Sequence, residues 1–433
     1  MSSSATTTSP FRASRPTRFG YASRLACREC GHTSELGAQH ACAECFGPLE
    51  VGYDYPPLTR ESIQAGPPNI WRYASLLPVP ADVATRPNTE PGMTRLVRAD
   101  RLASALGMRT LWVKDERANP THSFKDRVVA VALAAALEMG HKVLACPSTG
   151  NLANAVAAAA ARAGIRSVVL IPADLEPQKI IGTGVYGGTL ITVDGTYDDV
   201  NRLASELADD REDWAFVNVN VRPYYAEGSK TIGFEIAEQL GWRLPPQVVV
   251  PVASGAQLVK IDKAFRELVT LGLVDDAAYR VFGAQATGCA PVAAAFRAGH
   301  DVVQPVRPAT IAKSLAIGNP ADGPYVLDVT RRTGGAVADV GDDEIVEAIR
   351  LLAETEGIFG ETAVGVTLAT TRRLLESGQL DPDAETVIIN SGDGLKTLDA
   401  VAGSIPAVRP IRPTLQAFAE LEASGYVRKA VVA

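Results

Sequence analysis

The chain has 433 residues, which is enough for two or three domains built around a large hydrophobic core. Hydrophobic residues make up 46% of the chain and charged residues 21%, as is typical of a soluble globular protein. The net charge of −7 argues against a nucleic acid or an anionic membrane as partner, and no apolar run is long enough to span a bilayer.

Residues 1–20 are rich in Ser, Thr and Arg and lack the apolar stretch that a secretory signal requires. This composition fits two kinds of segment, a disordered tail and an organelle transit peptide. We expect a disordered tail, because chain termini are usually loose. We therefore expect the protein to be cytoplasmic.

Four of the six cysteines form two Cys-x-x-Cys pairs near the N-terminus, Cys27 with Cys30 and Cys42 with Cys45. Each pair can turn two thiolates toward one metal ion, and four thiolates complete a tetrahedral zinc site. Disulfides and free buried thiols are the alternatives, but disulfides are rare in a cytoplasmic chain. The spacing therefore predicts a structural zinc ion in a ribbon-like segment of residues 21–54.

Residues 52–92 are rich in proline and aromatic side chains, which predicts an extended arm on the surface of a larger domain or at a subunit contact. From residue 93 onward, apolar strand-like runs alternate with helical patterns. This alternation predicts an α/β fold with mainly parallel sheets. Strands are expected at residues 110–113, 143–146, 167–171, 190–193, 248–250 and 387–389, and helices at residues 151–162 and 197–207.

The order of these elements also predicts how the chain divides into domains. Residues 141–215 contain a compact run of alternating strands and helices, which we expect to move as a small domain. Residues 55–140 and 216–433 are then expected to build one larger domain from both sides of it.

Residues 119–127 read Asn-Pro-Thr-His-Ser-Phe-Lys-Asp-Arg and follow the first of these strands. Pro120 turns the chain, and Thr121 or Ser123 is expected to cap the helix that follows. Lys125 then lies in the first helical turn, where it is either a solvated surface cation or a partly buried amine. The apolar residues around it are compatible with a partly buried amine of lowered pKa, which suits Schiff-base chemistry, but this stretch alone leaves both alternatives open.

Three further polar stretches directly follow predicted strands: Ser-Thr-Gly-Asn at 148–151, Ala-Ser-Gly-Ala-Gln at 253–257 and Ser-Gly-Asp-Gly-Leu-Lys at 391–396. Together with residues 119–127, they resemble the motifs of the fold type II pyridoxal-phosphate enzymes, and within these the threonine synthases. The resemblance covers roughly residues 90–400. Some threonine synthase-like chains also carry an N-terminal zinc ribbon.

The resemblance implies a role for each stretch. Lys125 would bind pyridoxal 5'-phosphate as a Schiff base and, once freed, would move protons. Asn151 would donate to the ring hydroxyl, and Ser391 would bind the pyridine nitrogen. Backbone groups of residues Ala253, Ser254, Gly255, Ala256 and Gln257 would hold the cofactor phosphate, and those of Ser148, Thr149 and Gly150 the substrate carboxylate. The alternatives are a helix cap for Asn151, a capping serine for Ser391 and an ordinary strand-to-helix turn at 253–257.

The implied reaction converts O-phospho-L-homoserine and water to L-threonine and phosphate, by γ-elimination followed by addition of water. The sequence departs from the family pattern at Leu152, where many threonine synthases have threonine. It also departs at Tyr225, where some have an arginine thought to hold the substrate phosphate. Asn220 and Arg222 are close enough in sequence to replace that arginine and are expected to bind substrate, and Lys179 is the next candidate.

Two other classes of function remain open from the sequence. One is a different fold type II enzyme, such as a cysteate synthase or a serine/threonine dehydratase. The other is a cofactor-free binding module, against which the presence of both Lys125 and Asn151 argues. The expected partners are a small amino-acid substrate and a second copy of the chain in a homodimer, with no nucleic acid and no membrane.

Overall fold

The structure, a computed structural model, describes residues 16–82, 85–148, 150–173, 177–195, 197–405 and 408–426. The chain divides into two compact units, Met1–Thr397 and Leu398–Ala433. The first unit contains three β-sheets, and the second contains helices α14 (Leu398–Ala402) and α15 (Leu415–Ala423). None of the helices in the described ranges is long and apolar enough to cross a membrane.

The largest sheet has six strands in the order β12-β11-β10-β13-β5-β4. These strands are β4 (Arg95–Arg98), β5 (Leu111–Asp115), β10 (Gln247–Pro251), β11 (Arg280–Ala286), β12 (Val337–Val340) and β13 (Thr386–Asn390). All neighbours are parallel except β4, which is antiparallel to β5. The central strands β10 and β13 are buried at every position, which explains their unbroken runs of Val and Ile.

A second sheet has four parallel strands in the order β8-β7-β6-β9. They are β6 (Val143–Pro147), β7 (Arg166–Pro172), β8 (Thr189–Val193) and β9 (Trp214–Phe216). Apart from Phe216 at the end of β9, all four lie in residues 141–215, which the sequence predicts to be a small domain. The mobility of this segment and the domain boundaries stay predictions.

The N-terminal residues form a separate antiparallel ribbon with the strand order β2-β1-β3. Its strands are β1 (Ala22–Cys27), β2 (Thr33–Ser34) and β3 (Leu49–Tyr53). Apolar residues of the ribbon, such as Leu25 and Val51, share one hydrophobic cluster with α3 and α4. The ribbon is therefore packed into the body of the first unit.

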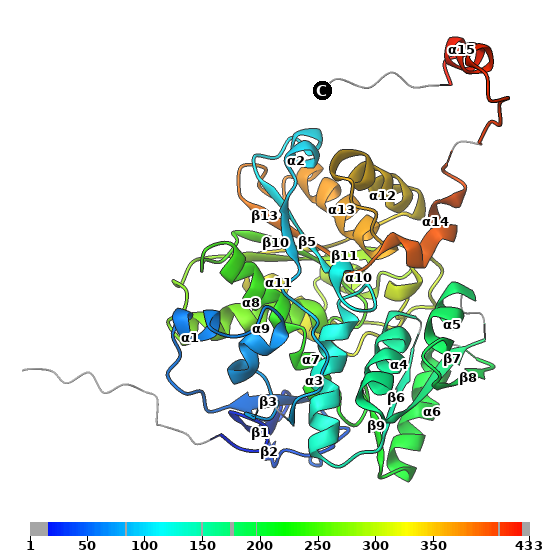
Figure 1. Ribbon diagram of the computed structural model, residues 1–433. Coiled ribbons are helices and arrows are strands. Elements are labelled where there is room, and N and C mark those ends of the chain that lie inside the picture. The colour runs from blue at the N-terminus through cyan, green and yellow to red at the C-terminus, as the bar shows by residue number, and fades with distance from the viewer. Residues whose placement is uncertain are drawn as a thin grey trace, which may run out of the picture. The chain divides into compact units, whose positions relative to one another are not determined.

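Helices cover both faces of the six-stranded sheet (Figure 1). Helices α12 (Asp342–Glu356) and α13 (Thr362–Glu376) lie on one side, and α8 (Lys230–Gln239) and α9 (Ala256–Thr270) lie on the other. The other described helices of this unit are α1 (Arg60–Gln64), α2 (Asp100–Leu106), α3 (Lys125–Glu138), α4 (Asn151–Ala163), α5 (Pro177–Gly184), α6 (Tyr197–Asp210), α7 (Arg222–Glu227), α10 (Pro291–Ala298) and α11 (Gly323–Arg332). The alternation predicted from the sequence is confirmed, with strand and helix ends within three residues of the expected ones.

Helix α3 lies in the interior of the first unit and is buried on almost every side. It packs against α4, which covers the four-stranded sheet, and against α7. Small side chains such as Ala132, Ala135 and Ala136 allow these helices to approach closely. A helix that is apolar all round belongs in the interior of a protein, which agrees with its place here.

A buried network of charges fixes the turn that precedes α3. The Arg127 side chain is fully buried and lies 2.5 Å from carboxylate oxygens of both Glu116 and Glu235. Lys114 pairs with Glu235 at 2.6 Å, and the Asn119 side-chain amide donates to Glu116 at 2.8 Å. Each buried charge has several partners, and these interactions offset the free-energy cost of removing the charges from water. A single unpaired charge in the same place would lack this compensation.

The expectation of an extended surface arm at residues 52–92 is wrong for its central part. Ile70–Leu76 forms a 3-10 helix, and Ile70, Tyr73 and Leu76 are fully or almost fully buried. Leu77 and Val79 complete a hydrophobic cluster with residues of α3. The prolines mark the ends of this segment, while the apolar side chains between them fill space against α3.

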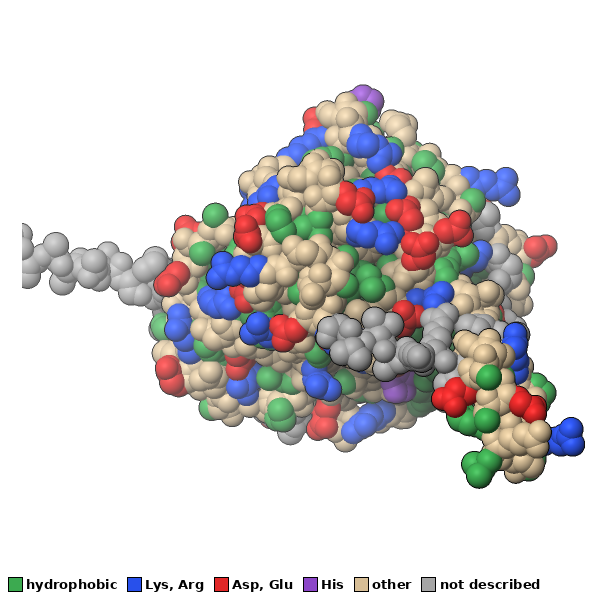
Figure 2. Space-filling model, turned by 90° about the horizontal axis from the view of Figure 1, so that it is seen from above, with side chains coloured by type: hydrophobic (Ala, Val, Ile, Leu, Met, Phe, Trp, Pro, Cys, Tyr) green, Lys and Arg blue, Asp and Glu red, His purple; other side chains and the backbone are tan. Residues whose placement is uncertain are grey.

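The surface of the protein carries many isolated ion pairs. Acidic and basic side chains are intermixed on the face shown in Figure 2. Exposed pairs such as Arg350 with Glu354 at 3.0 Å contribute only about 0–1 kcal/mol each. The stability of the fold therefore comes mainly from the apolar clusters and from the buried networks.

Candidate active site

The predicted site segments follow strands of the two parallel sheets. Lys125 lies beyond β5, Ser391 directly follows β13, and residues 253–257 follow β10, so three neighbouring strands of one sheet supply three segments. The fourth segment, residues 148–151, follows β6 of the other sheet. The carboxyl ends of parallel strands meet at one edge of a sheet, which is where ligands bind in such folds.

Backbone hydrogen bonds join the Lys125 loop to the Ser391 loop. The Phe124 amide donates to the carbonyl of Ser391 at 3.0 Å, and the Asp393 amide donates to the carbonyl of His122 at 3.0 Å. Since β5 and β13 are adjacent in the sheet, the loops that leave them continue to pair. The position of Lys125 relative to Ser391 is thus set by backbone contacts.

The expected cap of α3 by Thr121 or Ser123 is wrong. The helix begins at Lys125, and its N-cap residue, Phe124, provides no side-chain hydrogen bond. The amide and the hydroxyl of Thr121 instead both donate to the Asp126 carboxylate at 2.8 Å. Burial raises the pKa of Asp126 to about 6, although these two hydrogen bonds oppose the rise.

The Lys125 amine is half-buried among apolar and aromatic groups. Its Nζ atom donates to the Tyr225 hydroxyl at 2.9 Å and lies 4.5 Å from the centre of the Phe124 ring. Burial lowers the pKa of Lys125 to about 8, while nearby Glu361 and Cys146 act in the opposite direction. An amine with this pKa is partly neutral near neutral pH and can act as a nucleophile or a base.

A single carboxylate connects the two residues expected to bind the cofactor ring. The Asn151 amide donates to Glu361 Oε2 at 2.7 Å, and the Ser391 hydroxyl donates to Glu361 Oε1 at 2.7 Å. Lys396 donates to Asn151 Oδ1 at 3.1 Å, which fixes the amide so that its NH₂ group faces Glu361. Asn151 and Ser391 therefore lie close enough to contact one ligand.

The loop at residues 253–257 leads into the N-terminus of α9 and requires a glycine. Gly255 has a φ of +103°, and a Cβ atom there would lie 2.7 Å from the Val326 side chain. The Gln257 side-chain nitrogen is buried without a hydrogen-bond partner, as is the Ser314 hydroxyl, and both residues line the cavity described below. Helix N-termini with free donors bind anions, so this loop can hold a phosphate.

The segment at 148–151 begins α4. The Ser148 hydroxyl accepts hydrogen bonds from the amides of Gly150 and Ala153 at 3.1 and 2.9 Å, so it acts as a helix cap and keeps one proton to donate. Gly150 has a φ of +138°, and a Cβ atom there would lie 2.5 Å from a side-chain carbon of Lys179. Thr149 lies outside the described residues.

The residues proposed to hold the substrate phosphate differ in their surroundings. Arg222 lines the cavity and forms an ion pair with Asp322 at 2.5 Å. The Asn220 side chain accepts a hydrogen bond from the amide of Phe216 at 2.9 Å and donates one to the carbonyl of Trp214 at 3.1 Å. Both hydrogen bonds stabilise the turn after β9. We therefore leave Asn220 out of the substrate site proposed below.

A cavity of about 410 Å³ brings most of these residues together. Its lining includes Lys125, Ser148, Asn151, Arg222, residues 253–257 and Ser391. Gly150, Lys179 and Asn220 do not line it. Glu361 and Tyr225 do, so the cavity holds an amine, an arginine, a carboxylate and the N-terminus of a helix.

Comparisons with known proteins identify the family. Residues 88–392 match the family described as "Pyridoxal-phosphate dependent enzyme". The chain belongs to this family. It is 38% identical over 380 residues to the threonine synthase of Methanocaldococcus jannaschii, covering 86% of this chain and 93% of that one. It is 34% identical to the threonine synthase of Mycobacterium bovis, covering 80% and 94%.

Solved structures of other proteins share the fold. The chain is similar to a fungal L-serine ammonia-lyase from Rhizomucor miehei, with a TM-score of 0.61 and 22% identity over 72% of this chain and 96% of that one. It is also similar to maize serine racemase, with a TM-score of 0.59 and 23% identity over 72% and 92%. Both support the α/β fold type II architecture predicted from the sequence.

The residues of the cavity fit the cofactor of this family. The unpartnered donors of Gln257 and Ser314 match the needs of a phosphate beside the N-terminus of α9. The Asn151 and Ser391 donors, which converge on Glu361, can serve the edge of a pyridine ring. Lys125 supplies the amine that pyridoxal phosphate requires.

Sequence reasoning missed Glu361, Lys396 and Ser314. Lys396 closes the Ser-Gly-Asp-Gly-Leu-Lys stretch, and Glu361 precedes the N-terminus of α13, where a carboxylate is favoured in any helix. Neither signal distinguishes a site residue from an ordinary one. Their positions follow from the packing of α13 and the 391–396 loop around the cavity.

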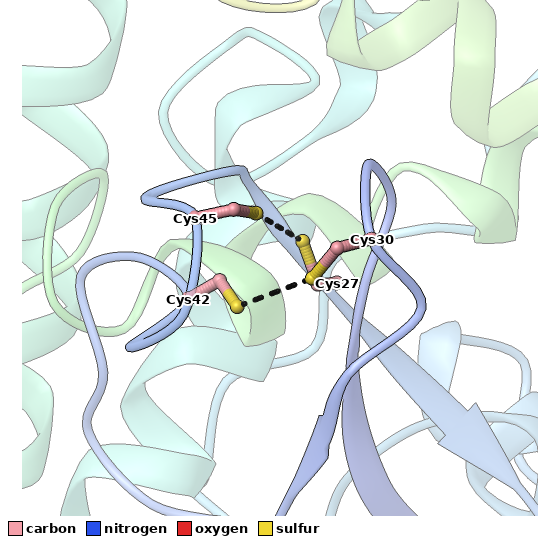
Figure 3. A group of neighbouring side chains, drawn as sticks. All are labelled: Cys27, Cys30, Cys42 and Cys45. Carbon is pink, nitrogen blue, oxygen red and sulfur yellow. Dashed lines mark hydrogen bonds between the residues drawn. The ribbon is translucent and has the colours of Figure 1, made fainter.

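The four N-terminal cysteines form a second candidate site. The sulfur atoms of Cys27, Cys30, Cys42 and Cys45 all lie within 4.8 Å of one another, and Figure 3 shows them pointing toward a common centre. Two of the sulfur–sulfur distances are 3.4 and 3.7 Å, near the ~3.8 Å separation that tetrahedral zinc–thiolate bonds of about 2.3 Å would give. The donor set and its geometry fit one zinc ion.

Proposed function

We propose that this pyridoxal-phosphate enzyme catalyses the threonine synthase reaction, converting O-phospho-L-homoserine and water to L-threonine and phosphate. The observation that carries the proposal is the placement of Lys125 in a cavity that also contains Arg222 and the N-terminus of α9. Threonine synthases that are 34–38% identical over 80–86% of the chain support the same reaction.

Within this proposal, Lys125 both carries the cofactor and moves protons. The cofactor, when bound, stabilises negative charge on the substrate carbons next to the amine. Because burial lowers the pKa of Lys125 to about 8, the amine can take up a proton and return it near neutral pH. The Tyr225 hydroxyl, 2.9 Å from Nζ, orients the amine.

The proposed cofactor contacts follow the cavity lining. Asn151 binds the ring hydroxyl, Ser391 binds the ring nitrogen, and residues 253–257 hold the phosphate at the start of α9. Gln257 and Ser314 add side-chain donors to this cradle. Glu361, which takes the Asn151 and Ser391 hydrogen bonds here, would lie beside the ring.

The proposed substrate contacts are made by Ser148, Thr149, Gly150 and Arg222. The first three precede α4 in the sequence, and donors at the start of that helix would hold the substrate carboxylate. Arg222 holds the substrate phosphate in place of the arginine that some threonine synthases have where this chain has Tyr225. A cation that stays in contact as charge develops on the leaving phosphate lowers the barrier to its departure.

The proposed function is tested by comparing substrates and variants. The purified protein should be yellow and should release phosphate faster from O-phospho-L-homoserine than from O-phospho-L-serine, with L-threonine as product. Lys125→Ala should lose both turnover and the visible absorbance, whereas Lys142→Ala, at an exposed lysine, should keep both. Preference for phosphoserine, or formation of a 2-oxo acid and ammonia, would indicate a cysteate synthase or a dehydratase instead.

We further propose that the four cysteines hold a structural zinc ion, and that the protein is a cytoplasmic homodimer. A four-thiolate site has no open position for substrate, so its role is to stabilise the ribbon. The subunit number can be measured by light scattering of the purified protein.

A further inference from the structure

Part of the cavity around Lys125 is lined by the N-terminal ribbon. His40, Ala41, Phe46 and Pro48 all contribute to the lining. The Phe46 side chain lines the cavity and yet is 83% exposed, so it stands at the open mouth. A large aromatic side chain in this position is not explained by packing in the core, because it buries little area.

The backbone at Phe46 gives a second, independent reason to look for a function. The two cysteine turns have the same hydrogen bonding: Gly31 donates to the carbonyl of Cys27 at 3.1 Å, and Phe46 donates to the carbonyl of Cys42 at 3.0 Å. Both residues are left-handed, with φ values of +73° and +58°. Glycine adopts this conformation without strain, whereas phenylalanine does not. The turn at Phe46 would therefore form more easily with glycine.

Buried charges hold one end of the ribbon loop against the body of the unit. Glu50, two residues after Pro48, pairs with Lys260 at 2.5 Å. The Tyr53 hydroxyl donates to Glu227 at 2.6 Å, and Lys263 donates to the carbonyl of Val51 at 2.9 Å. Lys260 and Lys263 belong to α9, whose N-terminus forms the proposed phosphate cradle.

Contacts on the other side of the ribbon complete its attachment. The Arg28 guanidinium lies 3.5 Å from the centre of the Tyr325 ring, and the Tyr325 hydroxyl donates to Glu29. The Tyr224 hydroxyl donates to the carbonyl of Gly37 at 3.3 Å. The next residue in the chain, Tyr225, accepts the hydrogen bond from Lys125. The ribbon is thus fixed on both sides of residues 40–48, so that segment can act as a rigid wall.

We propose that residues 40–48 of the ribbon form a wall of the substrate cavity, and that Phe46 covers its mouth and restricts access to Lys125. The identity of the substrate in this proposal rests on the proposed function. Cys42 and Cys45 lie within the wall, so a metal ion bound by the four cysteines would fix the segment that carries Phe46. Phe46 is then a positioning and specificity-determining residue that acts on substrate entry and binding.

The test uses the variant Phe46→Gly in the full-length holoenzyme. Because glycine relieves the left-handed strain, the melting temperature and the metal content should be unchanged or higher. The KM for O-phospho-L-homoserine should rise about five- to tenfold with kcat nearly unchanged, because the side chain that covers the mouth over the bound substrate is lost. Acrylamide should quench the fluorescence of the bound cofactor more strongly than in the wild type, and Phe46→Tyr should restore the wild-type values.

The matched control is Gly31→Ala, which introduces a side chain into the equivalent turn of the other cysteine pair. Gly31 does not line the cavity, so this variant should lose stability without changing KM or quenching. Unchanged KM and unchanged quenching in Phe46→Gly would overturn the inference. If the wild type binds pyridoxal phosphate but does not use phosphohomoserine, the proposed function fails, and the quenching comparison alone then decides the role of Phe46.

Discussion

At the scale of single residues, Glu361 has the widest influence on the candidate site. Its carboxylate accepts hydrogen bonds from Asn151 and Ser391 and opposes the lowering of the Lys125 and Lys396 pKa values. Burial favours the neutral amines, while the carboxylate favours the charged ones. The protonation of Lys125 is therefore set by the balance between burial and one nearby negative charge.

Replacing Glu361 should change the pH dependence of cofactor attachment. Attachment requires the neutral amine, so its rate in the apoprotein should fall as the pH drops through about 8, the pKa of Lys125. Glu361→Gln removes a charge that raises this pKa, so the midpoint should move to lower pH. The measurement is the growth of visible absorbance after pyridoxal phosphate is added across a pH series. Glu344→Gln, at a partly exposed residue paired with Arg373, should leave the midpoint in place, and a midpoint that moved upward in Glu361→Gln would contradict the argument.

Arg222 is the residue on which the substrate assignment depends most. Arg222→Ala should reduce kcat/KM for phosphohomoserine by about tenfold or more, because a charge-assisted contact to phosphate is worth ~1.5–3 kcal/mol. The visible absorbance of the bound cofactor should remain, since Arg222 does not contact Lys125. Arg243→Ala serves as the control, because Arg243 forms an exposed ion pair with Glu385 and does not line the cavity. Unchanged kinetics in Arg222→Ala would show that the substrate phosphate is held by other groups.

At the scale of elements, the ribbon depends on the two cysteine turns more than on its strands. Its three strands are short, and β2 has only two residues. An isolated small sheet of this kind is marginally stable in water. Apolar contacts of the ribbon with α3 and α4 stabilise its folded form. The proposed metal site would stabilise it further.

Loss of the proposed zinc site should lower stability before it affects chemistry. Metal analysis should give one zinc ion per chain, and Cys27→Ser and Cys45→Ser should each lose it and show a lower melting temperature. Cys289→Ser, at a cysteine outside the ribbon, should keep the metal. The measurement is elemental analysis combined with thermal unfolding, and a native protein without metal would rule the site out.

At the scale of the whole first unit, a buried network around Glu227 joins the ribbon to α7, α8 and α9. Glu227 is fully buried and pairs with Lys230 at 2.7 Å, Lys260 at 2.6 Å and Lys263 at 2.9 Å. Burial raises the pKa of Glu227, but the three lysines outweigh burial and hold it well below its usual value. Glu227 thus stabilises the folded state as a carboxylate.

Glu227→Gln should destabilise the protein by about 3–5 kcal/mol near neutral pH, because it leaves three buried lysines without their shared partner. The folded pKa is lowered, so the contribution of Glu227 is present above its unfolded pKa near 4.5 and is lost as the pH falls toward the folded value. The difference between wild type and variant in urea unfolding should therefore shrink below about pH 4.5. Glu354→Gln, which breaks an exposed pair, should change stability by less than about 1 kcal/mol at any pH.

The sequence by itself determined the elements and the motifs. Alternation of apolar runs with helical patterns depends on neighbouring residues only, so strands such as β6 and β13 were predicted within two residues of their ends. The cysteine spacing likewise determined that each pair lies in one local turn, whereas the contacts between the pairs, Cys27 with Cys45 and Cys30 with Cys42, depend on the folded ribbon. Lys125 was found through a motif whose residues are contiguous in the chain.

Tertiary structure decided everything that depends on contacts between distant segments. The prolines of residues 52–92 predict an extended surface arm, but α3 offers residues 70–79 an apolar surface, and burial of large side chains outweighs local composition. Glu361 meets Asn151 across 210 residues, and Phe46 reaches the Lys125 cavity only because the ribbon is attached to α7 and α9. Such placements are determined by the packing of the whole chain, since no local pattern records which distant surfaces a side chain will meet.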